Sequence, residues 1–158
     1  MCRVLGYLGK AISIDSLLTI PDNSLVNQSF DPEEHFVLQM AGFGMASWQQ
    51  DEPNETYPWV YKSLAPPFYD RNLGSLCERN ETNVLLAHLR ATLYDTLSYS
   101  SAISELNCHP FVYPTPAILN TYDKQKRLRS NGIGFAHNGG IAGFDQIRVP
   151  LIMKCNPN

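Results

Sequence analysis

The sequence lacks the features that mark several large classes of protein. It has no apolar run long enough to cross a membrane as a helix, and it has no internal repeat. The net charge of −3 over 158 residues provides no general attraction to nucleic acid or to an anionic membrane. The length suits one domain with its own core, and no linker-like stretch divides residues 1–158.

Nucleotide-binding and serine-hydrolase motifs are also missing. The sequence contains no GxGxxG, GxxxxGK[ST] or GxSxG pattern. Gly42-Phe43-Gly44 comes nearest to a dinucleotide loop, but it lacks the third glycine and the helix that such a loop opens. Nucleotide binding and serine-hydrolase chemistry therefore have no support in the sequence.

The cysteines are few and show no pattern of pairing. The chain has four of them, without a CxxC spacing: Cys2, Cys77, Cys108 and Cys155. We expect no disulfide framework in a chain of this size whose first residues show no secretory signal. The sequence therefore predicts a cytoplasmic protein in which Cys77 and Cys108 are buried thiols.

Histidine and cysteine side chains raise the alternative of a metal site. His88, Cys108, His109 and His137 supply suitable atoms, but their spacings match no common zinc pattern. Cys108 and His109 also make a poor catalytic pair, because neighbouring residues in an extended chain point to opposite faces. We expect no metal.

Apolar periodicity and turn residues predict short strands and short helices. Extended segments are expected over 3–8, 42–48, 59–61, 83–89, 108–113 and 133–137. Helices are expected over 12–18, 72–79 and 144–153. Gly9 should end the first strand, and the nearly continuous apolar run 83–89 predicts a strand covered on both faces. Since consecutive strands often lack an intervening helix, the pattern favours an α+β fold, or layered sheets flanked by helices, over a doubly wound parallel sheet.

Two segments carry further expectations. In 42–48, glycine or small residues alternate with large apolar ones, which predicts that other backbone packs closely against this strand. Residues 115–131 hold Lys124, Lys126, Arg127 and Arg129 without a clear period. We interpret that segment as a solvated loop, with contact to an anionic partner as the alternative.

The second residue offers a nucleophile with a base of its own. If Met1 is removed, as is usual before a small residue, Cys2 carries both a thiol and the free α-amino group. The amine titrates near pH ~8 and a free thiol near ~8.5, so each is partly in its reactive form at neutral pH. Proton transfer from thiol to amine would activate the sulfur without a histidine. Taken alone, Cys2 is a weak signal, because most cysteines at the second position are small apolar residues without chemistry.

Two distant stretches supply groups that suit such a nucleophile. Asn138-Gly139 is a common hairpin turn, but the Asn138 amide and the Gly139 backbone N–H could also form an oxyanion hole. Arg90 offers a planar fork that matches a carboxylate, although a solvated charge is ordinary at a strand end. His88 shares a strand face with Arg90.

Several motifs stand in order along the chain. They are Met1-Cys2-Arg3-Val4-Leu5-Gly6-Tyr7, Gly42-Phe43-Gly44, His88-Leu89-Arg90-Ala91, Asn107-Cys108-His109-Pro110-Phe111 and His137-Asn138-Gly139-Gly140-Ile141. Together they resemble the class II glutamine amidotransferases, a branch of the N-terminal nucleophile hydrolases. The stretch from Leu17 to Phe30 is similar to the small stand-alone members, which remove γ-glutamyl groups in glutathione degradation and ergothioneine synthesis.

The resemblance implies a fold, a site and a reaction. The fold would be a four-layer αββα sandwich. Cys2 would be the nucleophile, with Asn138 and Gly139 as its oxyanion hole. Arg90 would bind the α-carboxylate of a glutamyl substrate, with His88 and His137 as further substrate-binding candidates. The enzyme would attack a γ-glutamyl amide, release an amine or ammonia, and hydrolyse the γ-glutamyl thioester with water.

No metal or organic cofactor is implied, and neither nucleic acid nor membrane is expected as a partner. The expected partner is a small γ-glutamyl substrate such as glutamine or glutathione, and a partner protein subunit is a further candidate.

The sequence departs from the family's pattern at three places. Ala41 stands where the family usually has Asp before Gly-Phe-Gly, and Thr92 precedes Leu93 where the family has a small residue and then Thr. The family's chains also run well past the His-Asn-Gly motif, to an acidic residue that binds the substrate's α-amino group. We therefore expect 1–158 to be the N-terminal portion of such a domain, truncated at its C-terminus.

Two hypotheses from other classes stay open. One is a catalytically inactive, truncated relative that keeps the fold and acts as a binding or interaction module. The other is a nucleic-acid-binding domain that uses the basic segment, which would show steeply salt-dependent binding.

Overall fold

The protein is built from six strands, three helices and three short 3₁₀ turns in the residues that the structure describes. The computed structural model describes residues 2–31, 39–48, 57–91, 103–115 and 131–155. The strands are β1 (Arg3–Ser13), β2 (Phe43–Trp48), β3 (Trp59–Ser63), β4 (Glu81–Leu89), β5 (Phe111–Thr115) and β6 (Asn131–Phe135). The helices are α1 (Asp15–Leu18), α2 (Arg71–Arg79) and α3 (Phe144–Lys154), and the 3₁₀ turns are η1 (Asn27–Ser29), η2 (Pro67–Tyr69) and η4 (Glu105–Asn107).

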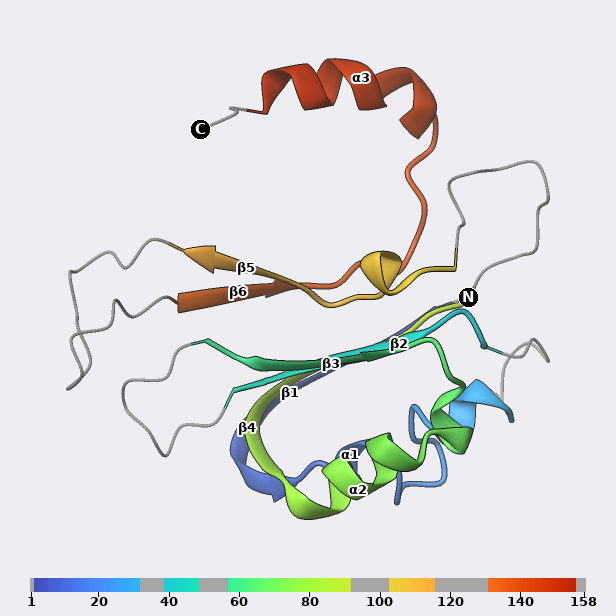
Figure 1. The fold of residues 1–158 in the computed structure, drawn as a ribbon, viewed down its shortest axis with the longest axis vertical. Helices are drawn as coiled ribbons and strands as arrows, with labels where there is room; N and C mark the ends of the chain where they lie inside the picture. The colour runs from blue at the N-terminus through green and yellow to red at the C-terminus, as the bar shows by residue number, and fades with distance from the viewer. Residues whose placement is uncertain (1, 32–38, 49–56, 92–102, 116–130, 156–158) are drawn as a thin grey trace.

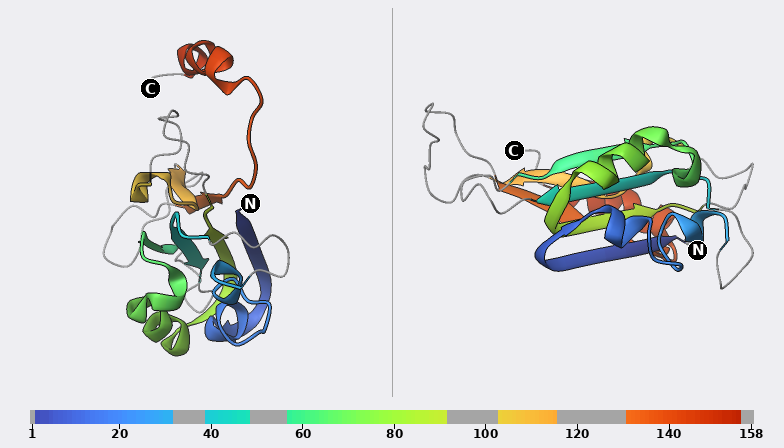
Figure 2. Two further views of the ribbon diagram at one scale, coloured as in Figure 1. Left: turned by 90° about the vertical axis from the view of Figure 1, so that its right-hand side faces the viewer. Right: turned by 90° about the horizontal axis from the view of Figure 1, so that it is seen from below.

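The strands form two antiparallel sheets. One sheet has the order β1-β4-β2-β3, and the other pairs β5 with β6. Helices α1 and α2 cover one face of the four-stranded sheet, and β5-β6 covers the other (Figures 1 and 2). The α+β prediction is confirmed, and the doubly wound parallel alternative is wrong for the described residues.

The core lies between the four-stranded sheet and the two small helices. β4 is central in that sheet, and its residues Leu85, Ala87 and Leu89 are all at most 1% exposed. They pack with buried side chains of β2 and the helices: Phe43, Met45, Ile14, Leu18, Leu73 and Cys77. Burying one large apolar side chain stabilises a fold by roughly 1.5–3 kcal/mol. The expectation of a strand covered on both faces is confirmed, because His88 on the opposite face of β4 is buried too.

Helix α2 matches its predicted position and inner face. Leu73 and Cys77 are buried, as expected for residues four apart on one helix face. The helix begins after Asp70, whose side chain accepts hydrogen bonds from the backbone N–H groups of Asn72 and Leu73. Tyr61 on β3 donates its hydroxyl to the same carboxylate, which fixes α2 against the sheet.

The two sheets approach closely because β2 and β6 carry glycines at the contact. A Cβ on Gly44 would lie 2.2 Å from the His109 carbonyl oxygen, and one on Gly42 would lie 2.4 Å from the Cys108 Sγ. A Cβ on Gly134 of β6 would likewise lie 2.6 Å from the Trp48 ring. The predicted close approach of backbone to residues 42–48 is confirmed.

The first strand and the first helix differ from prediction. β1 does not end at Gly9, because it pairs with β4 again at Ile12 and Ser13 after an irregularity. The Tyr7 hydroxyl donates to the Lys10 carbonyl across this irregularity, so Gly9 marks a bulge within a longer strand. α1 consequently begins only at Asp15, and no side chain caps it.

The fourth layer of the expected sandwich stays a prediction. Helix α3 forms where expected, with Pro150 inside it, and lies beyond β5-β6 on the side away from the larger sheet (Figure 1). None of its residues is buried. The basic segment expected to be a loop lies outside the described residues, apart from Thr115 and Asn131 at its two ends. No described helix has both the length and the apolar character needed to span a membrane.

Replacing Gly44 with alanine should destabilise the protein. The new Cβ would meet the backbone oxygen of His109, which cannot rotate away as a flexible side chain does. We expect Gly44→Ala to lower the free energy of unfolding in urea by about 1–3 kcal/mol. Gly6→Ala is the matched control, since nothing lies within 4 Å of a Cβ built on that strand residue. The control should change stability by less than about 0.5 kcal/mol; equal effects of the two substitutions would contradict the packing described for Gly44.

Candidate active site

Cys2 lies beside the end of β4. In the antiparallel pair of β1 and β4, Arg3 stands opposite Leu89, so residue 2 lies next to residues 90 and 91. The Cys2 Sγ donates to the Ala91 carbonyl oxygen and accepts from the Ala91 backbone N–H, both at 3.4 Å. Cys2 is half-buried. The sulfur is thus held in place by two backbone groups of Ala91.

Asn138 reaches the same residue from the second sheet. Its side-chain Nδ2 donates to the Cys2 carbonyl oxygen at 2.8 Å, which joins two residues 136 positions apart. Asn138 and Gly139 lie three and four residues beyond the end of β6 at Phe135, and both are exposed. Gly139 has a φ of 155°, a conformation that residues with a side chain rarely adopt. The structure therefore brings Cys2 together with the turn that the sequence analysis paired with it.

Arg90 continues the strand pairing of β4 by one residue. Its backbone N–H donates to the Gly42 carbonyl at 2.8 Å, and its carbonyl accepts from Ala41 at 3.1 Å. The guanidinium lies close enough to lower the pKa of the Cys108 thiol, although burial dominates and leaves that pKa raised. Arg90 therefore stands at the same end of the two sheets as Cys2.

The rings of His88 and His109 contact each other between the sheets. Their ring centroids are 4.6 Å apart in an edge-to-face arrangement, and His88 is 1% exposed. Burial lowers the pKa of His88 to about 4, and the neighbouring His109 adds to the effect, while a backbone group of His137 opposes it. Burial also lowers the pKa of His109, helped by the charges of His137, Lys62 and Arg90. Both rings are therefore neutral at pH 7.

His137 is exposed and directly precedes Asn138. Of the three substrate-binding candidates, Arg90 and His137 are therefore at least partly accessible, whereas His88 lies inside the packed layers.

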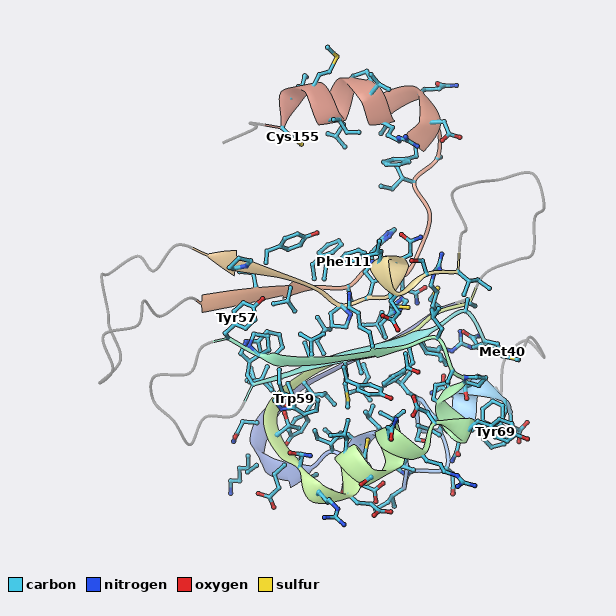
Figure 3. All side chains as sticks on the ribbon, viewed as in Figure 1. Met40, Tyr57, Trp59, Tyr69, Phe111 and Cys155 are labelled. Carbon is cyan, nitrogen blue, oxygen red and sulfur yellow. The ribbon has the colours of Figure 1, made fainter. Side chains whose placement is uncertain are left out.

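The remaining sulfur atoms lie apart from this group or are buried. Cys77 and Cys108 are buried free thiols, as predicted, and burial raises the pKa of Cys77 to about 11. Cys155 is exposed at the end of α3, away from the packed sheets (Figure 3). Across the described ranges, no three His, Cys, Asp or Glu side chains are arranged to hold a metal ion.

Two contacts at the site were not foreseen from the sequence. Arg3 donates through its Nε to the Gln28 side-chain oxygen at 2.8 Å, which ties the residue after Cys2 to η1. Arg3 and Gln28 both lie in stretches on which the family resemblance rests. A hydrogen-bonding Arg and Gln in two such stretches could have indicated that the stretches meet. The Ala91 contacts left no such signal, since they are made by backbone atoms that every residue has.

Comparison with known proteins finds relatives that are named as glutamine amidotransferases or γ-glutamyl hydrolases. The chain is 34% identical over 158 aligned residues to "Probable glutamine amidotransferase DUG3" of Saccharomyces cerevisiae, which covers 96% of this chain and 38% of the relative. The chain is class II glutamine amidotransferase-like. A γ-glutamyl-hercynylcysteine sulfoxide hydrolase of Mycobacterium tuberculosis is 28% identical to the chain over 93 residues. That alignment covers 58% of this chain and 38% of the relative.

The chain thus spans about 38% of the length of the curated relatives it matches. No family model matches the chain. Among solved structures, a glutamine aminotransferase class-II domain protein from Silicibacter pomeroyi has a TM-score of 0.49 at 18% identity, covering 97% of this chain and 43% of that one.

The His88 ring should remain uncharged far below the usual pKa of histidine. We expect its ring-proton NMR signals to be constant from pH 8 to about 5 and to titrate near 4. An unfolded histidine takes up its proton near ~6.5. Because the unfolded state binds the proton first, the His88 contribution to stability is lost as pH falls from ~6.5 toward 4. In denaturing urea all four histidines should titrate near ~6.5; a His88 signal that titrates there in the folded protein would refute its desolvation.

Proposed function

We propose that this chain hydrolyses a γ-glutamyl amide bond, in glutamine or in a γ-glutamyl peptide such as glutathione, through a thioester on Cys2. The observation that carries the proposal is the 2.8 Å contact of the Asn138 side chain with Cys2. It joins a nucleophile at the start of the first strand to an amide donor and a glycine in a distant turn. The similarity to proteins named as a glutamine amidotransferase and a γ-glutamyl hydrolase supports the same chemistry.

The nucleophile is activated at its own residue. Once Met1 is removed, the Cys2 α-amine takes the proton of the thiol, and the thiolate attacks the γ-carbonyl carbon of the substrate. The Ala91 N–H donates to the sulfur at 3.4 Å and helps to hold it in place. Collapse of the tetrahedral intermediate breaks the C–N bond, and the leaving amine takes the proton from the α-ammonium. Water, deprotonated by the same amine, then hydrolyses the thioester and releases glutamate.

Negative charge on the substrate oxygen requires preorganised donors. The Asn138 amide has two N–H groups, so one can keep the Cys2 carbonyl while the other points to the developing oxyanion. The Gly139 backbone N–H is the second proposed donor, and a glycine there lets the substrate approach the backbone closely. Such donors act most strongly where the charge develops in the transition state.

Arg90 is the proposed ligand of the α-carboxylate. It stands after β4, next to the Ala91 backbone that contacts the sulfur, and a guanidinium pairs with a carboxylate through two parallel hydrogen bonds. His137 and His88 complete the proposed substrate side of the site. The location in the cytoplasm, a partner protein subunit and the assignment of 1–158 to an N-terminal domain portion stay predictions.

Covalent labelling tests the nucleophile. A glutamine analogue with an electrophilic ketone side chain should add one equivalent to the processed protein, and peptide mass mapping should place it on Cys2. Cys2→Ala should abolish the adduct, whereas Cys155→Ala, which removes the exposed thiol, should leave it unchanged. The inactive binding module predicts no adduct on the processed wild type, or an adduct that persists in Cys2→Ala.

Removing the Asn138 amide tests the oxyanion hole. Asn138→Ala should lower kcat for γ-glutamyl amide hydrolysis by roughly 10²–10³-fold with little change in KM, because the lost donor acts mainly in the transition state. Steady-state kinetics with glutamine and glutathione as substrates measure both constants. An unchanged kcat would exclude Asn138 from the oxyanion hole.

A further inference from the structure

Arg3 follows the nucleophile directly and carries the first side chain of β1. It lies on the same strand face as Leu5 and Tyr7, because side chains two apart in a strand point the same way. Both of those residues pack against the core between the four-stranded sheet and the helices. Asn138 follows β6, on the opposite side of that sheet (Figure 1). Arg3 and Asn138 therefore belong to different layers of the fold.

Gln28 of η1 fixes the orientation of the Arg3 guanidinium. Its side-chain oxygen accepts from the Arg3 Nε at 2.8 Å, and its side-chain Nε2 donates to the Asn23 carbonyl at 2.9 Å. An amide that accepts on one side and donates on the other is fixed in one of its two orientations. The Gln28 backbone N–H is bonded too, to the Ser24 carbonyl at 2.9 Å. Gln28 is thus a rigid support, which holds the guanidinium at a defined place.

The carbonyl oxygen of Cys2 is contacted from both layers. The Asn138 Nδ2 lies 2.8 Å from it, and the Arg3 Nη1 lies 3.5 Å from it. The second contact is long for a hydrogen bond, so its attraction is mainly that of a positive charge for a carbonyl dipole. Two donors that come from different layers leave the peptide group between Cys2 and Arg3 little freedom to rotate.

This peptide group determines where the reactive groups of Cys2 stand. Once Met1 is removed, Cys2 is joined to the rest of the chain only through its carbonyl carbon. Rotation about the bond between its Cα and that carbon then moves the thiol and the α-amine together. We propose that Arg3 is a positioning residue, which holds the Cys2 carbonyl from the helix side and so keeps the thiol and the amine in place at the Asn138-Gly139 turn. This role rests on the proposed function, which uses both groups.

An arginine at this place has two alternative roles. One is direct contact with the substrate carboxylate, as proposed for Arg90, and the other is attachment of the segment around η1 to β1. Substrate contact would change KM, and attachment alone would change only the free energy of unfolding. Positioning of the nucleophile instead changes kcat of the folded enzyme. The three roles are therefore separable by experiment.

Removing the guanidinium is the first test. Arg3→Met keeps a long side chain but loses every donor. We expect kcat for γ-glutamyl amide hydrolysis to fall about 10- to 100-fold, as for a small displacement of a catalytic group, with KM within about 2-fold. In an Asn138→Ala background, Arg3→Met should lower kcat by less than about 3-fold, because the placement of Cys2 matters chiefly in relation to that donor.

Three results of this test would overturn the proposal. A raised KM with unchanged kcat would assign Arg3 to substrate contact. Unchanged values of both constants would leave it a stabilising role alone. An equal loss of kcat with and without Asn138 would show that the two side chains do not act together on Cys2.

Gln28 supplies the matched variants. Gln28→Leu removes the acceptor of the Arg3 Nε and should lower kcat, by a smaller factor than Arg3→Met. Gln28→Glu keeps an acceptor there, so it should retain kcat although it loses the bond to the Asn23 carbonyl. The control is Asn27→Ala, since Asn27 lies next to Gln28 but donates to two backbone carbonyls of its own segment. It should lower stability and leave kcat and KM unchanged; a loss of kcat equal to that of Gln28→Leu would overturn the proposal.

A measurement without substrate separates this proposal from the proposed function. The NMR signals of the Cys2 carbonyl carbon and of the Asn138 side-chain amide should shift in Arg3→Met and stay constant in Asn27→Ala. Signals that stay constant in Arg3→Met would overturn the proposal. Failure of the proposed function would look different: the processed wild type would neither hydrolyse γ-glutamyl substrates nor be labelled on Cys2, while the shifts in Arg3→Met would persist.

Discussion

The close approach of the His109 backbone to Gly44 is the contact on which the site depends. Because β2 has no side chain at Gly44, the carbonyl oxygen of His109, two residues before β5, occupies the space where a Cβ would otherwise lie. The β5-β6 sheet can then lie directly on β2 and β4, with Gly134 of β6 against Trp48. At this separation the Asn138 side chain, after β6, reaches the carbonyl of Cys2 just before β1.

The same contact sets the electrostatics of the site. Two histidine rings are enclosed between the sheets beside Arg90 and Lys62, and burial keeps both rings neutral at pH 7. The guanidinium of Arg90 acts on both rings as a positive charge, and the ammonium of Lys62 acts on His109 in the same way. A site with fixed positive charge and neutral imidazoles suits an anionic amino-acid substrate better than a cationic one.

Much of the fold could be predicted from the sequence because local patterns there agree with the tertiary structure. The apolar run of β4, the spacing of Leu73 and Cys77 in α2 and the glycines of β2 each have one physical meaning that packing then confirms. Gly9 was misleading because a glycine marks both strand ends and bulges, and only pairing with β4 distinguishes the two. The start of α1 was misplaced for the same reason, since Ile12 and Ser13 belong to that pairing.

The site could be predicted only in part. Cys2, Asn138 and Gly139 carry chemistry in their residue types, and the structure places Cys2 and Asn138 in contact. The contact of the His88 ring with His109 and the backbone contacts of Ala91 depend on how distant segments pack, which no spacing in the sequence encodes.

The most direct measurement is a crystal structure of the processed protein after reaction with an electrophilic glutamine analogue. It should show a covalent bond from the Cys2 sulfur, with the analogue oxygen within hydrogen-bond distance of the Asn138 side-chain nitrogen and the Gly139 N–H, and its α-carboxylate on Arg90. An adduct on Cys2 whose oxygen points away from both donors, or an adduct confined to another cysteine, would contradict the central claim that the turn after β6 completes the site of Cys2.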